Sequence, residues 1–209
     1  GKGKSSHYFE GMAGFYHQFM IYFYMKRKIK KYQNVIDKLL FLQQPDGLFY
    51  PVNGGGSCMD IDSITPLCFY YKNSEYRQNE IRNTLLRALP SLLSNQREDG
   101  GFCWAATNYT NPKHFIYLFT NLFFKEDFYH WSYCIRRFLI GKIFVRSTKP
   151  KKLTGWTLKQ RLETESSLFD TWLRCTSIFQ IVDTLSLTKN RNYRFLDFPG
   201  LAWFINPKQ

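Results

Sequence analysis

Two aspartates, Asp60 and Asp62, stand two positions apart, and the first of them comes four positions after a run of three glycines. A carboxyl group that is buried close to a second negative charge has a raised pKa, and it can then act as a general acid. Side chains at positions i and i+2 of a helix point apart, and acidic residues also favour the first turn of a helix. The pair is therefore interpreted in two ways, as a proton-donating site or as the polar start of a helix.

Two further acidic residues, Glu165 and Asp170, lie at the start of a long apolar segment near the C-terminal end. If this segment starts beside Asp60 and Asp62, four carboxylates gather at one place. Such a group can serve as a general acid, as a metal-binding patch or as a recognition site for a carbohydrate-like ligand. Asp170 is equally well placed to pair with Arg174, because side chains four positions apart on a helix are neighbours.

The composition indicates a globular protein with an unusual aromatic content. Hydrophobic residues make up 44% of the 209 positions and aromatic residues 19%. The aromatic excess has two interpretations, a coding bias towards Phe, Tyr, Lys and Asn or a cavity lined by aromatic rings. The five cysteines are an odd number and form no Cys-x-x-Cys pair. This pattern disfavours a disulfide framework and a thiolate zinc site, and it favours a reduced, cytoplasmic setting.

The chain is strongly basic, with a formal net charge of +13. One cluster occupies Lys26–Lys31, with five cations within six positions, and a second extends from Lys142 to Arg161. Such clusters favour anionic partners, namely a phosphate or diphosphate, nucleic acid or the head groups of a membrane surface, although solvated surface segments have the same composition. No known nucleic-acid-binding pattern occurs, so nucleic acid is not the expected partner. No apolar run is long enough to cross a bilayer, which predicts a cytoplasmic protein or one held peripherally at a membrane.

The elements that must position these residues are helices. Hydrophobic periodicity predicts them over residues 12–27, 32–43, from Asp60 or Asp62 to Lys72, and over 77–95, 113–124, 127–144 and 164–187. A basic loop is expected over 145–160 and an irregular tail over 190–209. No segment alternates as a strand would, so the prediction is one all-α domain over residues 1–209.

A short sequence recurs after two of these predicted helices. Residues 43–49 read QQPDGLF and residues 96–102 read QREDGGF, so both have the form Gln-x-x-Asp-Gly-x-Phe. We call these segments the first and second corner. The glycine can adopt the left-handed conformation that ends a helix, the glutamine can bond the freed backbone groups, and the aromatic ring can pack against the neighbouring helices. Repetition predicts stacked helix pairs, although chance similarity of two helix ends is the alternative.

The corner, the glycine-rich loop and the segment Asp60-Ile61-Asp62-Ser63 together resemble the (α/α)-toroid superfamily of squalene and diterpene cyclases and protein prenyltransferase β-subunits. The segment 168–174, LFDTWLR, is similar to an inner-helix start in uncharacterised bacterial squalene-cyclase-like proteins. The resemblance covers about residues 30–102 and 164–186. It implies a toroid or partial toroid built from helix hairpins, in which inner helices begin at the mouth of a central cavity and the corners are structural.

The resemblance also implies a chemistry. Asp62 aligns with the proton donor of class II terpene cyclases and Asp60 with its modulator, although Ser63 replaces the last aspartate of that motif. The substrate would be an isoprenoid or another lipid-like molecule, with carbocations stabilised by aromatic rings. The residues expected to contact it are Tyr16, His17, Phe69, Asp170, Trp172 and Arg174.

Zinc is a weaker implication of the same resemblance. Prenyltransferases bind it through Asp, Cys and His, for which this chain offers Cys58 and Asp60 with His7 or His17. The order here is Cys-x-Asp, the reverse of the family order, and no later histidine matches. His7 would otherwise cap the first helix and His17 would lie in the core. We therefore expect neither a metal nor another cofactor.

The length is short for a closed toroid, which needs about six helix pairs and commonly more than about 250 residues. An open apolar face would require the rest of a longer chain, a second copy or a partner chain to cover it. Two hypotheses for function follow. One is a protonation-initiated cyclase or a transferase, and the other is a non-catalytic module that holds a ligand or a protein partner.

Overall fold

The computed structural model describes residues 8–50, 54–106, 116, 150 and 161–188. Within these residues the regular elements are the helices α1 (Tyr8–Tyr24), α2 (Tyr32–Leu42), α3 (Ser57–Asn73), α4 (Gln78–Leu93) and α7 (Leu168–Thr184). The described residues contain no strand, only isolated bridges between Gln96 and Phe102 and between Cys103 and Ser166. The all-α prediction is confirmed for this part of the chain. The segments 113–124, 127–144, 145–160 and 190–209 lie outside it, apart from Ile116 and Pro150.

Three helix starts differ from the predictions. Helix α1 spans Tyr8–Tyr24, so it begins four residues before the predicted range 12–27 and ends three residues before its end. Helix α3 begins at Ser57, after Gly56, so Asp60 lies in its first turn and Asp62 in its second. Neither aspartate caps the helix, which corrects the predicted start at these residues. Helix α7 begins at Leu168, later than the predicted Thr164, because the Ser167 side chain accepts the backbone N–H of Asp170 at 3.1 Å and caps it.

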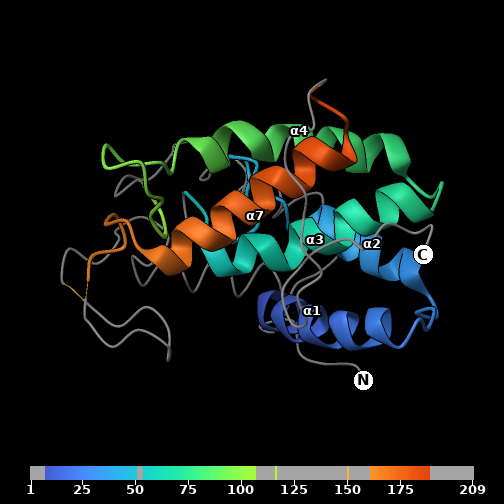
Figure 1. Cartoon of the computed structure of the whole chain (residues 1–209). Coiled ribbons are helices and arrows are strands. Elements are labelled where there is room, and N and C mark those ends of the chain that lie inside the picture. The colour runs from blue at the N-terminus through green and yellow to red at the C-terminus, as the bar shows by residue number, and fades with distance from the viewer. Residues whose placement is uncertain (1–7, 51–53, 107–115, 117–149, 151–160, 189–209) are drawn as a thin grey trace.

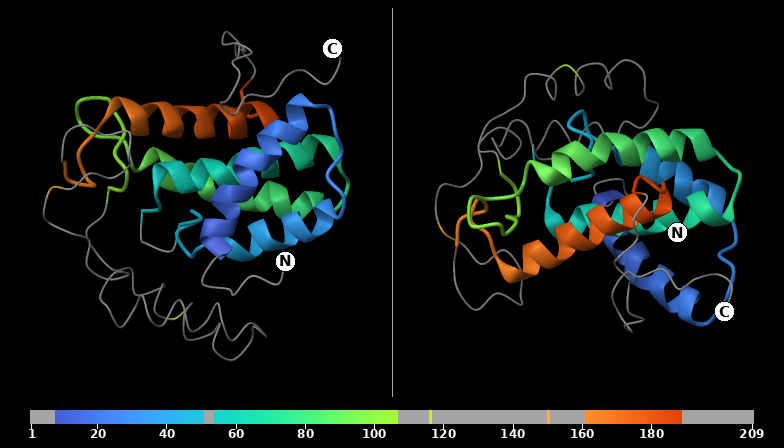
Figure 2. Two further views of the ribbon diagram at one scale, coloured as in Figure 1. Left: turned by 90° about the horizontal axis from the view of Figure 1, so that it is seen from below. Right: turned by 45° about the horizontal axis from the view of Figure 1, so that its top comes forward.

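Helix α3 is central and packs against each of the other four helices (Figure 1). Helices α3 and α7 run in one direction and α2 and α4 run in the opposite one, while α1 crosses them obliquely (Figures 1 and 2). The core that joins them is aliphatic at α2, α4 and α7, with buried Ile36, Leu85 and Ile181. As a consequence of the alternation, the two corners lie at the end of the bundle where α3 and α7 begin.

Aromatic rings fill the contact between α1 and α3. Phe19 of α1 lies 5.3 Å from Phe69 and 6.1 Å from Tyr70, measured between ring centroids. Tyr32, at the start of α2, stacks on Tyr70 at 5.4 Å. Edge and stacked contacts of this kind stabilise packed rings. In this part of the chain, therefore, many aromatic residues are explained by core packing.

The two corners have the same hydrogen bonds. The Gln43 side chain donates to the carbonyl of Gly47 at 2.8 Å, and Gln96 donates to Gly100 at 3.1 Å. In each corner the aspartate also accepts the backbone N–H two residues later, at 3.0 Å in the first and 2.9 Å in the second. Both glycines have a positive φ, 87° at Gly47 and 82° at Gly100. The predicted roles of glutamine and glycine are confirmed, except that each glycine shapes the turn after the helix and does not itself end the helix.

Each corner is also bonded to the first turn of a helix that follows it in the chain, the first corner to α3 and the second corner to α7. The N–H of Phe49 donates to Asp60 at 2.9 Å, and the N–H of Phe102 donates to the hydroxyl of Thr171 at 2.8 Å. Asp60 and Thr171 are the fourth residues of α3 and α7 respectively. The units α2–corner–α3 and α4–corner–α7 are therefore equivalent substructures, and the repeat is not a coincidence of helix ends.

Candidate functional site

A buried ion pair joins the beginnings of α3 and α7. The Arg174 guanidinium donates to a carboxylate oxygen of Asp60 at 2.7 Å, and both side chains are fully buried. The pair is possible because Asp60 lies in the first turn of α3 and Arg174 in the second turn of α7, and these helices pack side by side. Water cannot screen an ion pair that is fully buried. Replacement of one partner would therefore leave the other as an uncompensated buried charge.

The remaining bonds of this pair connect several loops. Asp60 accepts the backbone N–H groups of Phe49 and Gly56, each at 2.9 Å. Arg174 donates to the carbonyls of Trp104 at 2.5 Å and Gly54 at 3.2 Å. Burial raises the pKa of Asp60, while Arg174 and the two N–H groups oppose that rise by stabilising the carboxylate. These donors occupy both oxygens, so Asp60 connects the first corner and the glycine loop to α7.

Asp170 forms a second buried centre beside the first. It accepts the hydroxyls of Ser57 at 2.5 Å and Ser167 at 2.7 Å, and its other partner is the guanidinium of Arg161. The alternative pairing of Asp170 with Arg174 is wrong, because Arg174 reaches across to α3. Of the four carboxylates expected to gather, Asp60, Asp62 and Asp170 are buried, whereas Glu165 is exposed.

Asp62 differs from its neighbours in having little to neutralise it. The side chain is 1% exposed, and its Oδ2 atom has no hydrogen-bond partner among the described residues. Burial, and secondly the charge of Asp60, raise the pKa of Asp62 to about 8. A carboxyl with this pKa is mostly protonated at neutral pH, which is the state that a general acid requires.

Asp62 shares one face of α3 with Cys58, Thr65 and Phe69, which lie at helical spacings of three and four from one another. The Thr65 hydroxyl donates to Gln180 of α7 at 2.9 Å, whereas Phe69 contacts α1 through Phe19. The face that carries Asp62 is therefore the one between α1 and α7.

The zinc hypothesis finds no support in the described residues. They contain no group of three or more residues able to hold a metal ion, and His7 lies outside them. Burial, with the nearby charges of Asp62, Asp60 and Asp170, raises the pKa of Cys58 to about 12, so this thiol stays protonated. Zinc requires the thiolate, and the oxygens of Asp60 already accept other donors.

The predicted substrate-contacting residues do not converge on one place. Asp170 and Arg174 lie in the first two turns of α7 and bond across to the first turn of α3. Tyr16 is buried in the core that also contains the α1–α3 contact. His17 is exposed, which corrects its interpretation as a core residue, and Trp172 is also exposed, with its ring 6.1 Å from that of Phe169.

Sequence reasoning missed Ser57, Arg161 and the Trp104 carbonyl as members of this polar network. Ser57 follows the glycine run directly, and a hydroxyl at that point is a common helix-start signal. The sequence indicates Arg161 only as part of a basic segment, whereas in the structure its guanidinium pairs with Asp170. The Trp104 carbonyl belongs to the backbone, so the residue type gives no indication of this contact. Only the packing of the chain after the second corner brings the carbonyl to Arg174.

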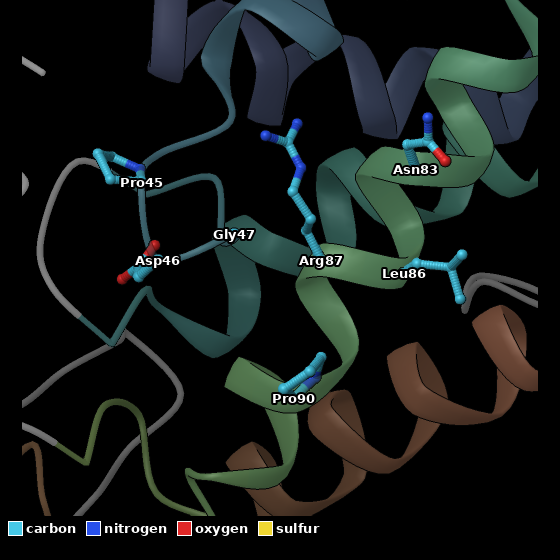
Figure 3. A pocket seen from close by; sticks show the side chains of 7 residues that line it. All are labelled: Pro45, Asp46, Gly47, Asn83, Leu86, Arg87 and Pro90. Carbon is cyan, nitrogen blue, oxygen red and sulfur yellow. The ribbon is translucent and has the colours of Figure 1, made fainter.

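A separate groove lies between α4 and the first corner (Figure 3). Its lining residues are Pro45, Asp46, Gly47, Asn83, Leu86, Arg87 and Pro90. The Arg87 side chain extends towards the corner and donates to the Gln43 side chain (Figure 3). This groove contains none of the predicted site residues, and its contacts fasten the corner to α4.

The replacement Asp62→Asn should remove a pH dependence of stability. The pKa of Asp62 is about 8 in the folded protein, against about 3.9 for an unfolded aspartate. Folding therefore takes up a proton between these values, and wild-type stability falls by about 1.4 kcal/mol per pH unit as the pH rises through that window. Below the window the contribution is fully present, and above about pH 8 no further loss is expected.

Urea unfolding of both proteins at several pH values tests this expectation. Between about pH 5 and pH 8, the free energy of unfolding of the variant should rise relative to that of the wild type by roughly 3.5 kcal/mol. Comparison of the two proteins cancels the titration of groups that they share. A stability difference that does not change with pH would contradict the raised pKa of Asp62.

No protein family, curated protein or solved structure matches this chain. None of the helices in the described part of the chain has the length and apolarity that crossing a bilayer demands.

Proposed function

We propose that this chain forms part of an α/α-toroid-like array that binds an isoprenoid or other lipid-like substrate and protonates it through Asp62. The repeated unit supports the architecture, since two outer helices, two corners and two inner helices have matching hydrogen bonds. In such an array the face of α3 between its two inner neighbours points towards the centre, and Asp62 lies on that face.

The observation that carries the proposal is the contrast between two aspartates two residues apart. Asp60 is held by Arg174 and backbone donors, whereas the Oδ2 atom of buried Asp62 has no partner among the described residues. Burial close to the Asp60 charge keeps a proton on Asp62 at neutral pH. This division, one carboxylate fixed and ionised and the other neutral, is how two neighbouring carboxyl groups take different roles.

The proposed reaction begins when the Asp62 hydroxyl group transfers its proton to an alkene carbon of the substrate. The Asp62 O–H bond breaks and a C–H bond forms, which leaves a carbocation on the substrate and a carboxylate on Asp62. A base that removes a proton from the cyclised cation ends the reaction. No cofactor is needed for these steps, because the proton is the only reagent that the protein supplies.

Incubation with squalene and with geranylgeranyl diphosphate, followed by mass spectrometry of the extracted products, tests the proposal. Wild-type protein should form a cyclised isomer of one of them, and Asp62→Asn should reduce its rate by about 10²- to 10⁴-fold. Arg82→Gln, an exposed change on α4, is the matched control and should keep the wild-type rate. An unchanged product yield with Asp62→Asn would exclude Asp62 as the acid.

A binding module without turnover is the second candidate, because a protonated buried carboxyl can also donate a hydrogen bond to a bound ligand. Native mass spectrometry of protein purified from its host distinguishes the two. A retained ligand, a second copy or a stoichiometric partner chain, together with no product in the incubations, would favour this candidate.

A further inference from the structure

The last turns of α1 expose apolar side chains to solvent. Ile21 is 58% and Met25 53% exposed, and Tyr22 and Tyr24 are 44% and 41% exposed. These four residues occupy five consecutive positions, while Phe19 and Met20 of the same helix are buried in the core and Phe23 packs against Phe69 of α3. Exposed large apolar residues that cluster in this way mark an interaction surface.

The connection from α1 to α2 adds a cluster of positive charge to this surface. Lys26, Arg27, Lys28, Lys30 and Lys31 are all exposed. The sequence contains no acidic residue from Gly11 to Ile36, and these five side chains form no ion pair with any other described residue. We call the exposed residues of 21–31 the basic-apolar patch.

The backbone holds this patch in a defined shape. The N–H of Arg27 donates to the carbonyl of Tyr22 at 2.9 Å, and the N–H of Lys26 donates to Phe23 at 2.9 Å. Lys26 has a φ of 51°, so the end of α1 is a Schellman motif with lysine in the left-handed position. The apolar side chains and the cations therefore project from one fixed helix end.

We propose that the basic-apolar patch docks the protein on an anionic lipid bilayer. Ile21 and Met25 gain free energy only by leaving water for a hydrocarbon environment, and tyrosine favours the boundary between acyl chains and head groups. The cations are then level with the phosphate and serine head groups, where each lysine or arginine strengthens binding about fivefold. Charge alone would suit nucleic acid as well, but exposed isoleucine and methionine cannot form a hydrogen bond with a base edge or a phosphate.

This inference rests on α1 and its connection to α2, and it is independent of Asp62. A protein that fails to convert any isoprenoid could still dock on lipid, and a catalytically active one could fail to dock. The two proposals can therefore be tested and rejected separately.

Sedimentation of the full chain with vesicles tests the docking proposal. Vesicles of phosphatidylcholine with phosphatidylserine should bind the protein, and vesicles of phosphatidylcholine alone should bind it far more weakly. The double change Arg27→Gln with Lys28→Gln should weaken binding about 30-fold. It leaves Lys26 and Lys31 unchanged, since both have a positive φ and contribute to local structure.

A matched double change, Arg82→Gln with Arg97→Gln, removes the same charge from exposed positions on α4 and the second corner. It should alter vesicle binding by less than about fivefold, because those cations lie outside the patch. Ile21→Ser with Met25→Ser should weaken binding about tenfold or more while leaving the net charge and the core unchanged.

Three results would overturn the proposal. The first is an equal loss of vesicle binding in the two charge-matched variants, which would show that binding depends on net charge and not on the basic-apolar patch. The second is full vesicle binding after Ile21→Ser with Met25→Ser, which would leave the apolar residues without a role. The third is absence of vesicle binding combined with tight binding of a single-stranded oligonucleotide, which would assign the patch to nucleic acid.

Discussion

Arg174→Met is expected to lower the free energy of unfolding by about 3 to 5 kcal/mol. Methionine fills a similar volume but leaves the fully buried carboxyl of Asp60 without its guanidinium partner. The carbonyls of Trp104 and Gly54 lose their donors as well. The cost arises mainly from the uncompensated buried groups and less from the attraction that is lost.

Urea unfolding followed by far-UV circular dichroism measures this effect. Arg82→Met removes an arginine from an exposed position of α4 and should change stability by less than about 0.5 kcal/mol. The double variant Asp60→Asn with Arg174→Met should cost less than the two single changes added together, because it removes both charges of the pair. A cost below about 1 kcal/mol for Arg174→Met alone would show that the pair contributes little to the fold.

Gly47→Ala is the second change with a large expected effect, and the repeated corner provides its control. A Cβ atom at Gly47 would lie 2.3 Å from the carbonyl oxygen of Arg87, which belongs to the backbone of α4. A Cβ atom at Gly100 would have nothing within 4 Å, although its φ of 82° is nearly the same as the 87° of Gly47. The two positions therefore share the conformational strain but differ in the clash.

Gly100→Ala should cost about 1 to 2 kcal/mol, which is the usual penalty for a non-glycine residue in the left-handed region. Gly47→Ala should cost at least about 2 kcal/mol more, because the backbone of α4 has to move away from the new methyl group. Thermal or urea unfolding of the two variants side by side measures the difference. Equal losses of stability in the two variants would contradict the close contact between Gly47 and the backbone of α4.

Much of the helical framework was predictable from periodicity. Helices α2 and α4 match the predicted ranges because one apolar stripe of each faces the core while the other side is polar. The starts of α3 and α7 were less predictable, since they depend on Gly56 and Ser167. Aspartate is a common cap residue, but in α3 the aspartate is buried one turn further along and accepts from other loops.

The site was predictable in its residue types and only partly in its pairings. Asp60, Asp62, Asp170 and Arg174 were all recognised as candidates, yet a rule based on i,i+4 spacing paired Arg174 with Asp170. The structure pairs it with Asp60, which is more than one hundred residues away in the chain. Local rules describe neighbours on one helix, and they cannot rank a neighbour against a partner that another helix brings to the same place.

By itself the sequence determined the all-α class, the two corners and the residue types available for chemistry at the starts of α3 and α7. These follow from local preferences, namely apolar periodicity, glycine in left-handed turns and glutamine bonding to backbone carbonyls. Only the tertiary structure decided that Asp60 is neutralised by Arg174 while Asp62 keeps its proton. Burial and the position of distant charges set the protonation of a carboxyl group, and both arise only when α3 packs against α1 and α7.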